Sequence, residues 1–335
     1  MSMVHEPLRY AHDEGHTDVC YTEDGSKFIT CGADGDIRIW SSEENEDPIH
    51  NCIGEWALSV RQRGNNVYVA TSSNDIQILT LPDGDRDGVL DRFVAPINHI
   101  AVGKNSNLIA LAGEDMEVKL INLERMNKEI KVLSGLSGPC LSVAICPNSK
   151  MIAASSGDSK LRIWDIESTN LLKEIACFPK VNSFANAKIL GRIDFDPIKG
   201  IHLAYPDKSN IVILNTDDWS QHATLNCDVT AMYSIVQYSP CGNYIAATSE
   251  EGDFVVWDAS SQMVINRSKH PKSVSIGGLM WNPKESMDQH SVNEENNDNE
   301  DVFENINFED DDDEDNENAI SVEKLKRQHM ESPSL

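Results

Sequence analysis

Short apolar runs separated by polar turns recur along the chain, and they are clearest between residues 140 and 177. Four runs follow one another there: Cys140 to Cys146, Met151 to Ser155, Lys160 to Asp165 and Leu172 to Cys177. Short runs bounded by Gly, Asp, Asn or Ser are typical of β-strands joined by tight turns. This stretch therefore predicts one four-stranded unit.

The same four-run pattern occurs six times, with a period of about 40 to 50 residues. The third run of each unit ends at Trp40, Leu79, Ile121, Trp164, Leu214 or Trp257. Three of these runs follow a tight polar turn and end in Trp, which is the sequence mark of a WD-repeat blade. The sequence therefore predicts an all-β chain folded as a WD40-type β-propeller with six recognisable blades. Such blades usually present a binding surface, which disfavours an enzyme.

Two units have less regular boundaries. The fourth strand of the second unit is expected over Leu90 to Phe93, after a polar stretch. The first strand of the fifth unit is expected over Gly191 to Asp196, after an unusually long connector from Phe178 to Leu190. A connector of this length is either an ornament of the fold or a functional loop.

A seventh unit begins at Val274 but supplies only one apolar run, which ends at Pro283. Beyond it the sequence is rich in Glu, Asp and Asn, with too few apolar residues to offset the entropy of ordering two more strands. An N-terminal strand often completes the last blade of a propeller, and Pro7 to Tyr10 is placed to do so. We therefore expect a propeller over residues 1–284, with an incomplete seventh blade, and a disordered acidic low-complexity tail over residues 285–335.

Charge is distributed unevenly between these two parts. The chain has a net charge of -27, and residues 288–317 contain 15 acidic residues and no Lys or Arg. A basic footprint for nucleic acid is missing. In the tail, apolar residues among acids, such as Val302-Phe303 and Ile306 to Phe308, resemble a short docking motif. The alternatives are a solvated spacer or a contact with a basic partner such as histone tails. Lys324 to Arg327 is either half of a nuclear import signal or a plain basic cluster.

Motifs for catalysis or for cofactor binding are not found. No phosphate loop, dinucleotide fingerprint, metal-spaced His/Cys cluster or nucleophile elbow occurs, so we expect no enzyme activity, no cofactor and no metal. The eight cysteines include no CxxC pair and are interpreted as small buried residues of a reducing compartment. No apolar stretch is long enough for a bilayer and the first residues do not resemble a secretory signal, so we expect an intracellular protein without membrane contact.

One set of polar residues is predicted to be structural. His16, Thr30, Asp34 and Trp40 match the His, Ser/Thr, Asp and Trp that hydrogen-bond to one another inside WD blades. Asp34 is expected to accept from His16, the imidazole to contact the Thr30 hydroxyl, and Thr30 to reach the indole N–H. Other blades keep part of this set, at Asp158, Trp164 and Trp257. An enzymatic interpretation is disfavoured because the residues lie within a blade, and a metal site at His12 and His16 is a weaker alternative.

Several segments between the strands resemble one family more closely than WD proteins in general. They are Arg9 to Cys20, Thr30 to Trp40, Asp83-Gly84, Asp87 to Phe93, Asn186 to Arg192 and Trp219 to His222. The chain resembles, over roughly Pro7 to Pro283, the N-terminal propeller of the acidic nucleoplasmic DNA-binding protein family. These are WD-repeat and HMG-box DNA-binding proteins, also described as chromosome transmission fidelity factors and replisome adaptors. The connector from Phe178 to Leu190 also matches this family.

The resemblance implies a non-catalytic adaptor at replicating chromatin in the nucleus. Family members link the replicative helicase complex to DNA polymerase alpha-primase and act in replication initiation, DNA repair and sister-chromatid cohesion. They continue into a second propeller with a trimerising helical domain and, in animals, an HMG box, so this sequence resembles a truncated form. Histones are possible partners of the acidic tail, and direct DNA contact is left open. The alternative is an acidic-tailed propeller that serves as a histone-type chaperone or a general interaction scaffold.

Overall fold

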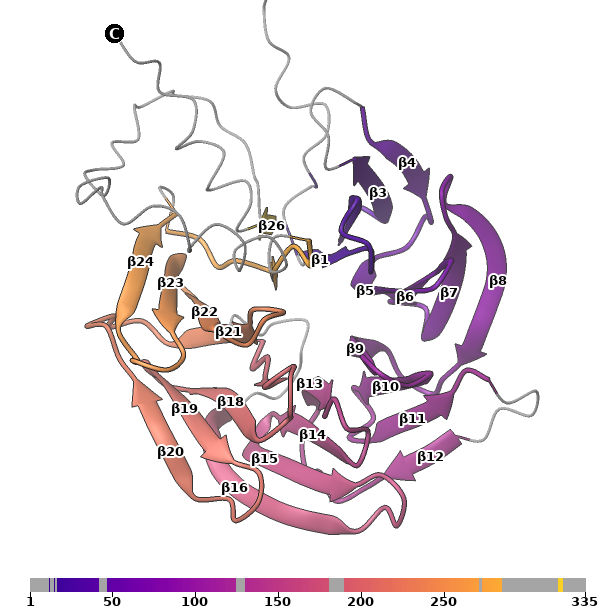
Figure 1. Cartoon of the computed structure of the whole chain (residues 1–335). Helices are drawn as coiled ribbons and strands as arrows, with labels where there is room; N and C mark the ends of the chain where they lie inside the picture. The colour runs from indigo at the N-terminus through magenta and orange to yellow at the C-terminus, as the bar shows by residue number, and fades with distance from the viewer. Residues whose placement is uncertain are drawn as a thin grey trace, which may run out of the picture.

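The computed structural model describes residues 12, 15, 17–41, 47–124, 130–180, 190–270, 273–284 and 319–321. Within this part of the chain, six four-stranded antiparallel sheets stand around a central axis as the blades of a propeller (Figure 1). The first strand of each blade is innermost and the fourth is at the rim. The expected WD40-type, all-β fold is confirmed.

The first three blades follow the chain in simple order. The first contains β1 (Thr17–Tyr21), β2 (Lys27–Gly32), β3 (Asp36–Ser41) and β4 (Ile49–Cys52). The second contains β5 (Ala57–Arg63), β6 (Asn66–Thr71), β7 (Asp75–Thr80) and β8 (Asp85–Arg92). The third contains β9 (Ile97–Val102), β10 (Leu108–Gly113), β11 (Val118–Asn122) and β12 (Ile130–Leu133).

The next three blades repeat this order and complete most of the ring. The fourth contains β13 (Cys140–Ile145), β14 (Met151–Ser156), β15 (Asp158–Asp165) and β16 (Leu171–Lys180). The fifth contains β17 (Asp194–Phe195), β18 (His202–Asp207), β19 (Asn210–Asn215) and β20 (Gln221–Leu225). The sixth contains β21 (Tyr233–Tyr238), β22 (Tyr244–Ser249), β23 (Asp253–Asp258) and β24 (Val264–Lys269).

The hydrophobic core lies between neighbouring blades. One cluster joins Ile29 and Ile39 of the first blade to Val69 and Leu79 of the second, and further clusters repeat this arrangement around the ring. Inner strands such as β6 and β14 are buried along most of their length, because a blade covers each face. Rim strands such as β4 alternate between half-buried and exposed residues.

The seventh position of the ring is occupied by a single short strand of the expected repeat. β25 (Gly278–Met280) packs against both β1 and β21 and so lies between the sixth and first blades. It pairs in parallel with β26 (Ala319–Ser321), which falls in the segment expected to form a tail without strands (Figure 1). The N-terminal segment expected to complete this blade lies outside the described residues, as does most of the predicted tail.

Two strands differ most clearly from their predicted bounds. β17 covers only Asp194–Phe195, because the backbone of Arg192 bonds to the neighbouring blade: its N–H donates to Ser234 O and its carbonyl accepts from Val236 N. β8 begins earlier than expected, at Asp85, and pairs with β7 through two register shifts. The connector before the fifth blade lies outside the description over residues 181–189.

Candidate functional site

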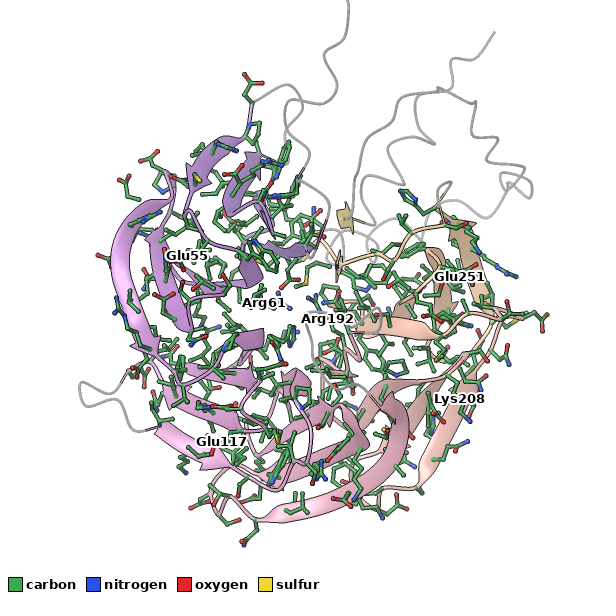
Figure 2. All side chains as sticks on the ribbon, turned by 180° about the vertical axis from the view of Figure 1, so that it is seen from behind. Glu55, Arg61, Glu117, Arg192, Lys208 and Glu251 are labelled. Atoms are coloured by element: carbon green, nitrogen blue, oxygen red, sulfur yellow. The ribbon has the colours of Figure 1, made fainter. Side chains whose placement is uncertain are left out.

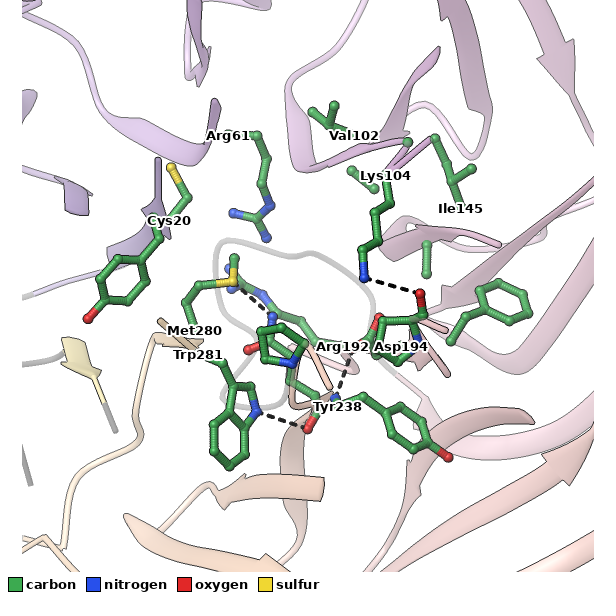
Figure 3. A pocket seen from close by; sticks show the side chains of 18 of the residues that line it. Cys20, Arg61, Val102, Lys104, Ile145, Arg192, Asp194, Tyr238, Met280 and Trp281 are labelled. Carbon is green, nitrogen blue, oxygen red and sulfur yellow. Dashed lines mark hydrogen bonds between the residues drawn. The ribbon is translucent and has the colours of Figure 1, made fainter. Parts of the chain in front are cut away.

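A cavity of about 680 Å³ opens at the mouth of the central channel where the innermost strands end (Figure 3). Residues from the ends of β1, β5, β9, β13, β17, β21 and β25 line it, so every position of the ring contributes. Side chains such as Val102, Ile145 and Trp281 form apolar walls, while Arg61 and Arg192 lie near the centre of the ring (Figures 2 and 3). The volume of this cavity lies in the range of pockets that bind small ligands and peptide segments.

Asp18 is the buried centre of a hydrogen-bond network beside this cavity. Its Oδ1 accepts from Arg192 Nη1 at 2.6 Å and from Val19 N at 2.9 Å. Its Oδ2 accepts from Arg61 Nη1 and Ser59 Oγ, both at 2.8 Å, and from the Val60 amide at 3.1 Å. Burial alone would raise the pKa of Asp18, but the charges of Arg192 and Arg61 outweigh it and hold that pKa well below its usual range.

The network continues from Arg61 to the third and fourth blades. Arg61 Nη2 lies 2.6 Å from His99 Nε2, and because a guanidinium can only donate, this imidazole nitrogen accepts. His99 Nδ1 then faces Ser142 Oγ at 3.4 Å. The network therefore connects the fifth, first, second, third and fourth blades through side chains on or beside their innermost strands. It fixes the walls of the channel with respect to one another.

Burial also shifts the pKa values of two charged residues that line the cavity, Arg192 and Asp194. Burial lowers the pKa of Arg192, and Asp18 only partly opposes that effect. Burial raises the pKa of Asp194 to about 7, although the Tyr238 amide donates to its Oδ2 at 2.9 Å. Asp194 is therefore partly protonated near neutral pH, which lowers the negative charge of the cavity wall.

In the residues that the structure describes, no three His, Cys, Asp or Glu side chains are grouped so that they could hold a metal ion. All eight cysteines are free, and Cys20, Cys31, Cys140 and Cys146 are buried as expected, with burial raising the pKa of each thiol. Cys52, however, is exposed, because it ends the rim strand β4. No helix of the described segments is long and apolar enough to cross a membrane.

The predicted structural set of the first blade is found with a different histidine in contact. His12 Nδ1 donates to Asp34 at 3.0 Å, and His12 Nε2 accepts from Thr30 Oγ1 at 2.9 Å. Trp40 Nε1 donates to the same hydroxyl at 3.0 Å. Burial lowers the pKa of His12, in keeping with a neutral ring in this tautomer. His16, the predicted member, lies outside the described residues.

Gly32 is the residue that makes room for His12. A Cβ built on Gly32 would lie 2.6 Å from His12 Nδ1, so the imidazole rests directly on the backbone between Thr30 and Asp34. From the sequence, this role was expected of His16 in the Gly-His pair beside the strand, and His12 was considered only as a metal ligand. The network is internal to the blade and contributes stability, with no access to the channel cavity.

The corresponding residues of the other blades form parts of this arrangement. Asp158 Oδ2 pairs with Arg162 Nη2 at 2.7 Å, as Asp34 pairs with Arg38 at 3.2 Å in the first blade. Trp164 is buried between blades. Trp257 packs edge-on against Tyr233, with ring centroids 5.8 Å apart. Its Nε1 is buried without a hydrogen-bond partner among the described residues, so this Trp acts through packing.

Comparison with known proteins identifies the family of the propeller. The family described as the WDHD1 first WD40 domain matches residues 9–292. WD repeat and HMG-box DNA-binding protein 1 of Xenopus laevis is 36% identical over 297 residues, which cover 88% of this chain and 26% of that protein. The Homo sapiens protein of the same name is 34% identical over 84% of this chain and 25% of its own length. Minichromosome loss protein 1 of Schizosaccharomyces pombe is 25% identical over 85% of this chain and 35% of its own length. The chain thus spans about a quarter of the first two relatives.

Proposed function

This chain belongs to the WDHD1 family, and from that membership we propose that its propeller is a non-catalytic adaptor at replicating chromatin in the nucleus. In this role it links replication proteins, with DNA polymerase alpha-primase and the replicative helicase complex as the partners that the family resemblance suggests. Replication initiation, repair and sister-chromatid cohesion are the processes in which such a link acts. The propeller supplies binding surfaces and the network around Asp18 keeps them rigid.

The observation that supports this proposal most directly is the extent of the family match. It runs over residues 9–292, so it includes all six described blades and β25. The names of the relatives refer to DNA binding and to minichromosome loss, which supports chromosomes as the place of action. A net charge of -27 disfavours non-specific attachment to DNA, so the proposed contacts are with proteins.

Affinity capture from nuclease-treated nuclear extracts of S-phase cells tests this proposal. The full chain is expected to enrich DNA polymerase alpha-primase and helicase subunits over a tagged, unrelated propeller. A chain without residues 285–335 is expected to retain them, because the propeller carries the contacts. Failure of the full chain to enrich any replication protein would overturn the proposal.

A histone-type chaperone is the second candidate, and the acidic segment favours it. Residues 288–317 hold 15 acidic residues without a Lys or Arg, which is the charge that a basic histone tail complements. In the same capture experiment this function predicts histones as the main partners. It also predicts that they are lost when residues 288–317 are deleted and when the salt concentration is raised.

A further inference from the structure

At the channel cavity, Arg61, Arg192 and Lys104 face two buried carboxylates, Asp18 and Asp194, and burial raises the pKa of Asp194 to about 7. Arg61 and Arg192 each donate to one oxygen of Asp18, so two guanidinium groups share a single buried negative charge. Lys104 also lines the cavity, and its Nζ donates to the carbonyl of Pro197 at 3.2 Å. Lys104 forms no ion pair with any residue that the structure describes. Lys104 is exposed, whereas Arg61 and Arg192 are largely buried and share the charge of Asp18. Buried charges are normally paired, so an anion in the cavity would complete the pairing of the two guanidinium groups.

A buried donor without a partner lies at the same place. Arg192 is only 5% exposed, and its Nη2 has no hydrogen-bond partner within the described segments. Gln237 Oε1, also in the cavity lining, is likewise buried and unpartnered there. The amide nitrogen of Gln237 donates instead to Met280 Sδ at 2.9 Å, which is a weak acceptor. Nearly all buried polar groups of native proteins are satisfied, so these two atoms indicate an unfilled site. Arg192 Nη2 requires an acceptor such as an oxyanion, whereas Gln237 Oε1 requires a donor such as a backbone N–H of the same bound segment.

The arrangement of the side chains defines what fits. Figure 3 shows Arg61 and Lys104 directed into the same space, with Arg192 and Met280 beneath them. Guanidinium groups match the planar, two-oxygen geometry of oxyanions. Met280 and Trp281 form an apolar wall beside the arginines, and Met280 has a flexible side chain that can change rotamer to expose them. A volume of about 680 Å³ is much larger than a single ion needs and suits a peptide segment.

We propose that this cavity binds an oxyanionic side chain, a carboxylate or a phosphate monoester, on an extended segment of a protein partner. Arg61, Arg192 and Lys104 hold the anionic group, and the wall formed by Met280 and Trp281 contacts an apolar residue next to it. This inference rests on the proposed adaptor role, because it assigns one of the surfaces through which a partner is bound. The acidic character of the rest of the chain makes the choice of ligand selective, since other surfaces repel an acidic segment.

A peptide library provides the test. The immobilised full chain is incubated with degenerate eight-residue peptides whose central residue is fixed as Glu, phosphoserine, Gln or Lys. We expect at least tenfold enrichment of the Glu or phosphoserine pool over the Gln and Lys pools, with an apolar residue selected next to the anion. The ratio of the Glu and phosphoserine pools identifies which anion is the better ligand. Equal enrichment of all four pools, or preference for Lys, would overturn the inference.

Variants assign the binding to this cavity. Lys104→Met leaves the network around Asp18 intact and is expected to lower the affinity of the best peptide by about threefold to tenfold. Arg192→Lys keeps a positive charge opposite Asp18 but removes the forked donor geometry, and a loss of at least tenfold is expected. Lys208→Met, at the rim of the ring in Figure 2, is the matched control and leaves the affinity unchanged. Unchanged affinity in both cavity variants would overturn the assignment.

The same variants separate this inference from the proposed function. If Lys104→Met and Arg192→Lys weaken the binding of anionic peptides while replication proteins are still captured as before, the cavity binds anions but is not the surface used for those partners. If the wild-type chain captures replication proteins yet selects no anionic peptide, the anion site is wrong and the adaptor role stands. If anionic peptides are selected but no replication protein is captured, only the adaptor role fails.

Discussion

Arg192 of the fifth blade donates to Asp18 of the first blade at 2.6 Å, although 174 residues separate them in the chain. This contact crosses the central channel and complements the hydrophobic clusters, most of which connect adjacent blades. It therefore holds the first and fifth blades together across the inside of the ring. Because Arg61 binds the other oxygen of Asp18, the loss of this one carboxylate leaves two buried guanidinium groups without their counter-charge.

Asp18→Asn is accordingly expected to lower the free energy of unfolding by about 3 to 5 kcal/mol, the cost of breaking a buried ion pair from one side. Chemical denaturation of the full chain measures this effect. Asp217→Asn, a substitution at an exposed position, is the control and should change stability by less than about 0.5 kcal/mol. A loss for Asp18→Asn no greater than that of the control would show that the network does not stabilise the ring.

Asp194 gives the fold a pH dependence of opposite sign to that of an ordinary ion-paired carboxylate. Its pKa is raised from 3.8 to about 7 by burial. Between these two values the folded chain retains a proton that the unfolded chain releases, so stability falls as the pH rises from about 4 to about 7 and then levels off. Asp194→Asn removes this titration while keeping an acceptor for the Tyr238 amide.

We therefore expect Asp194→Asn to be more stable than the wild type at pH 8, by an amount on the order of 2 to 4 kcal/mol. The difference should shrink steadily towards pH 5. Denaturation curves at a series of pH values measure it, and the common titrations of other groups cancel in the comparison. A difference that does not depend on pH would contradict a raised pKa at Asp194.

The hydrogen-bonded set of the first blade can be compared with a site in the sixth that has a similar hydroxyl but no partner. Thr30 Oγ1 contacts both His12 and Trp40, whereas Thr248 Oγ1 is buried without a partner among the described residues. Thr30→Val should cost about 1 to 3 kcal/mol, because it leaves a buried ring nitrogen and an indole N–H unsatisfied.

Thr248→Val removes an unsatisfied group, so it should be neutral or stabilise by up to about 1 kcal/mol. Thermal and chemical denaturation of the two variants in parallel tests both expectations. In the Thr30→Val chain, the indole N–H resonance of Trp40 should also shift in the NMR spectrum. If the two valine variants had equal effects, the hydrogen bonds of Thr30 would contribute nothing to stability.

The sequence predicts the blades well because their pattern is local. Runs such as Met151 to Ser155 are bounded on both sides by short turns of polar residues, so the order of the strands follows directly from the pattern. β17 is the informative failure, since its predicted first half pairs with the neighbouring blade through Arg192. The strand boundary there is set by a tertiary contact, which a local pattern does not contain.

The channel network could not be predicted for the same reason. Asp18 and Arg192 come together only when the ring closes, and no spacing rule relates residues so far apart. One signal was nevertheless present: Asp18 stands directly before the apolar run Val19 to Tyr21, within the buried strand β1. An acid in a buried strand requires a buried counter-charge, so this position alone predicts an Arg or Lys from elsewhere in the fold. The choice between His12 and His16 depended likewise on a contact with Gly32.

The contact between β25 and β1, here called the seam, depends on a glycine. A Cβ at Gly278 would lie 2.9 Å from Val19 Cγ1 and 3.0 Å from Val19 N, so only glycine lets the two strands approach this closely. Gly278→Ala should force β25 away from β1 and lower the free energy of unfolding by about 1 to 3 kcal/mol. Amide hydrogen exchange in β1 should accelerate as the seam opens. Gly64→Ala, where a Cβ meets open space, adds only backbone strain and should leave β1 exchange unchanged. Equal β1 exchange in the two variants would mean that β25 does not close the ring.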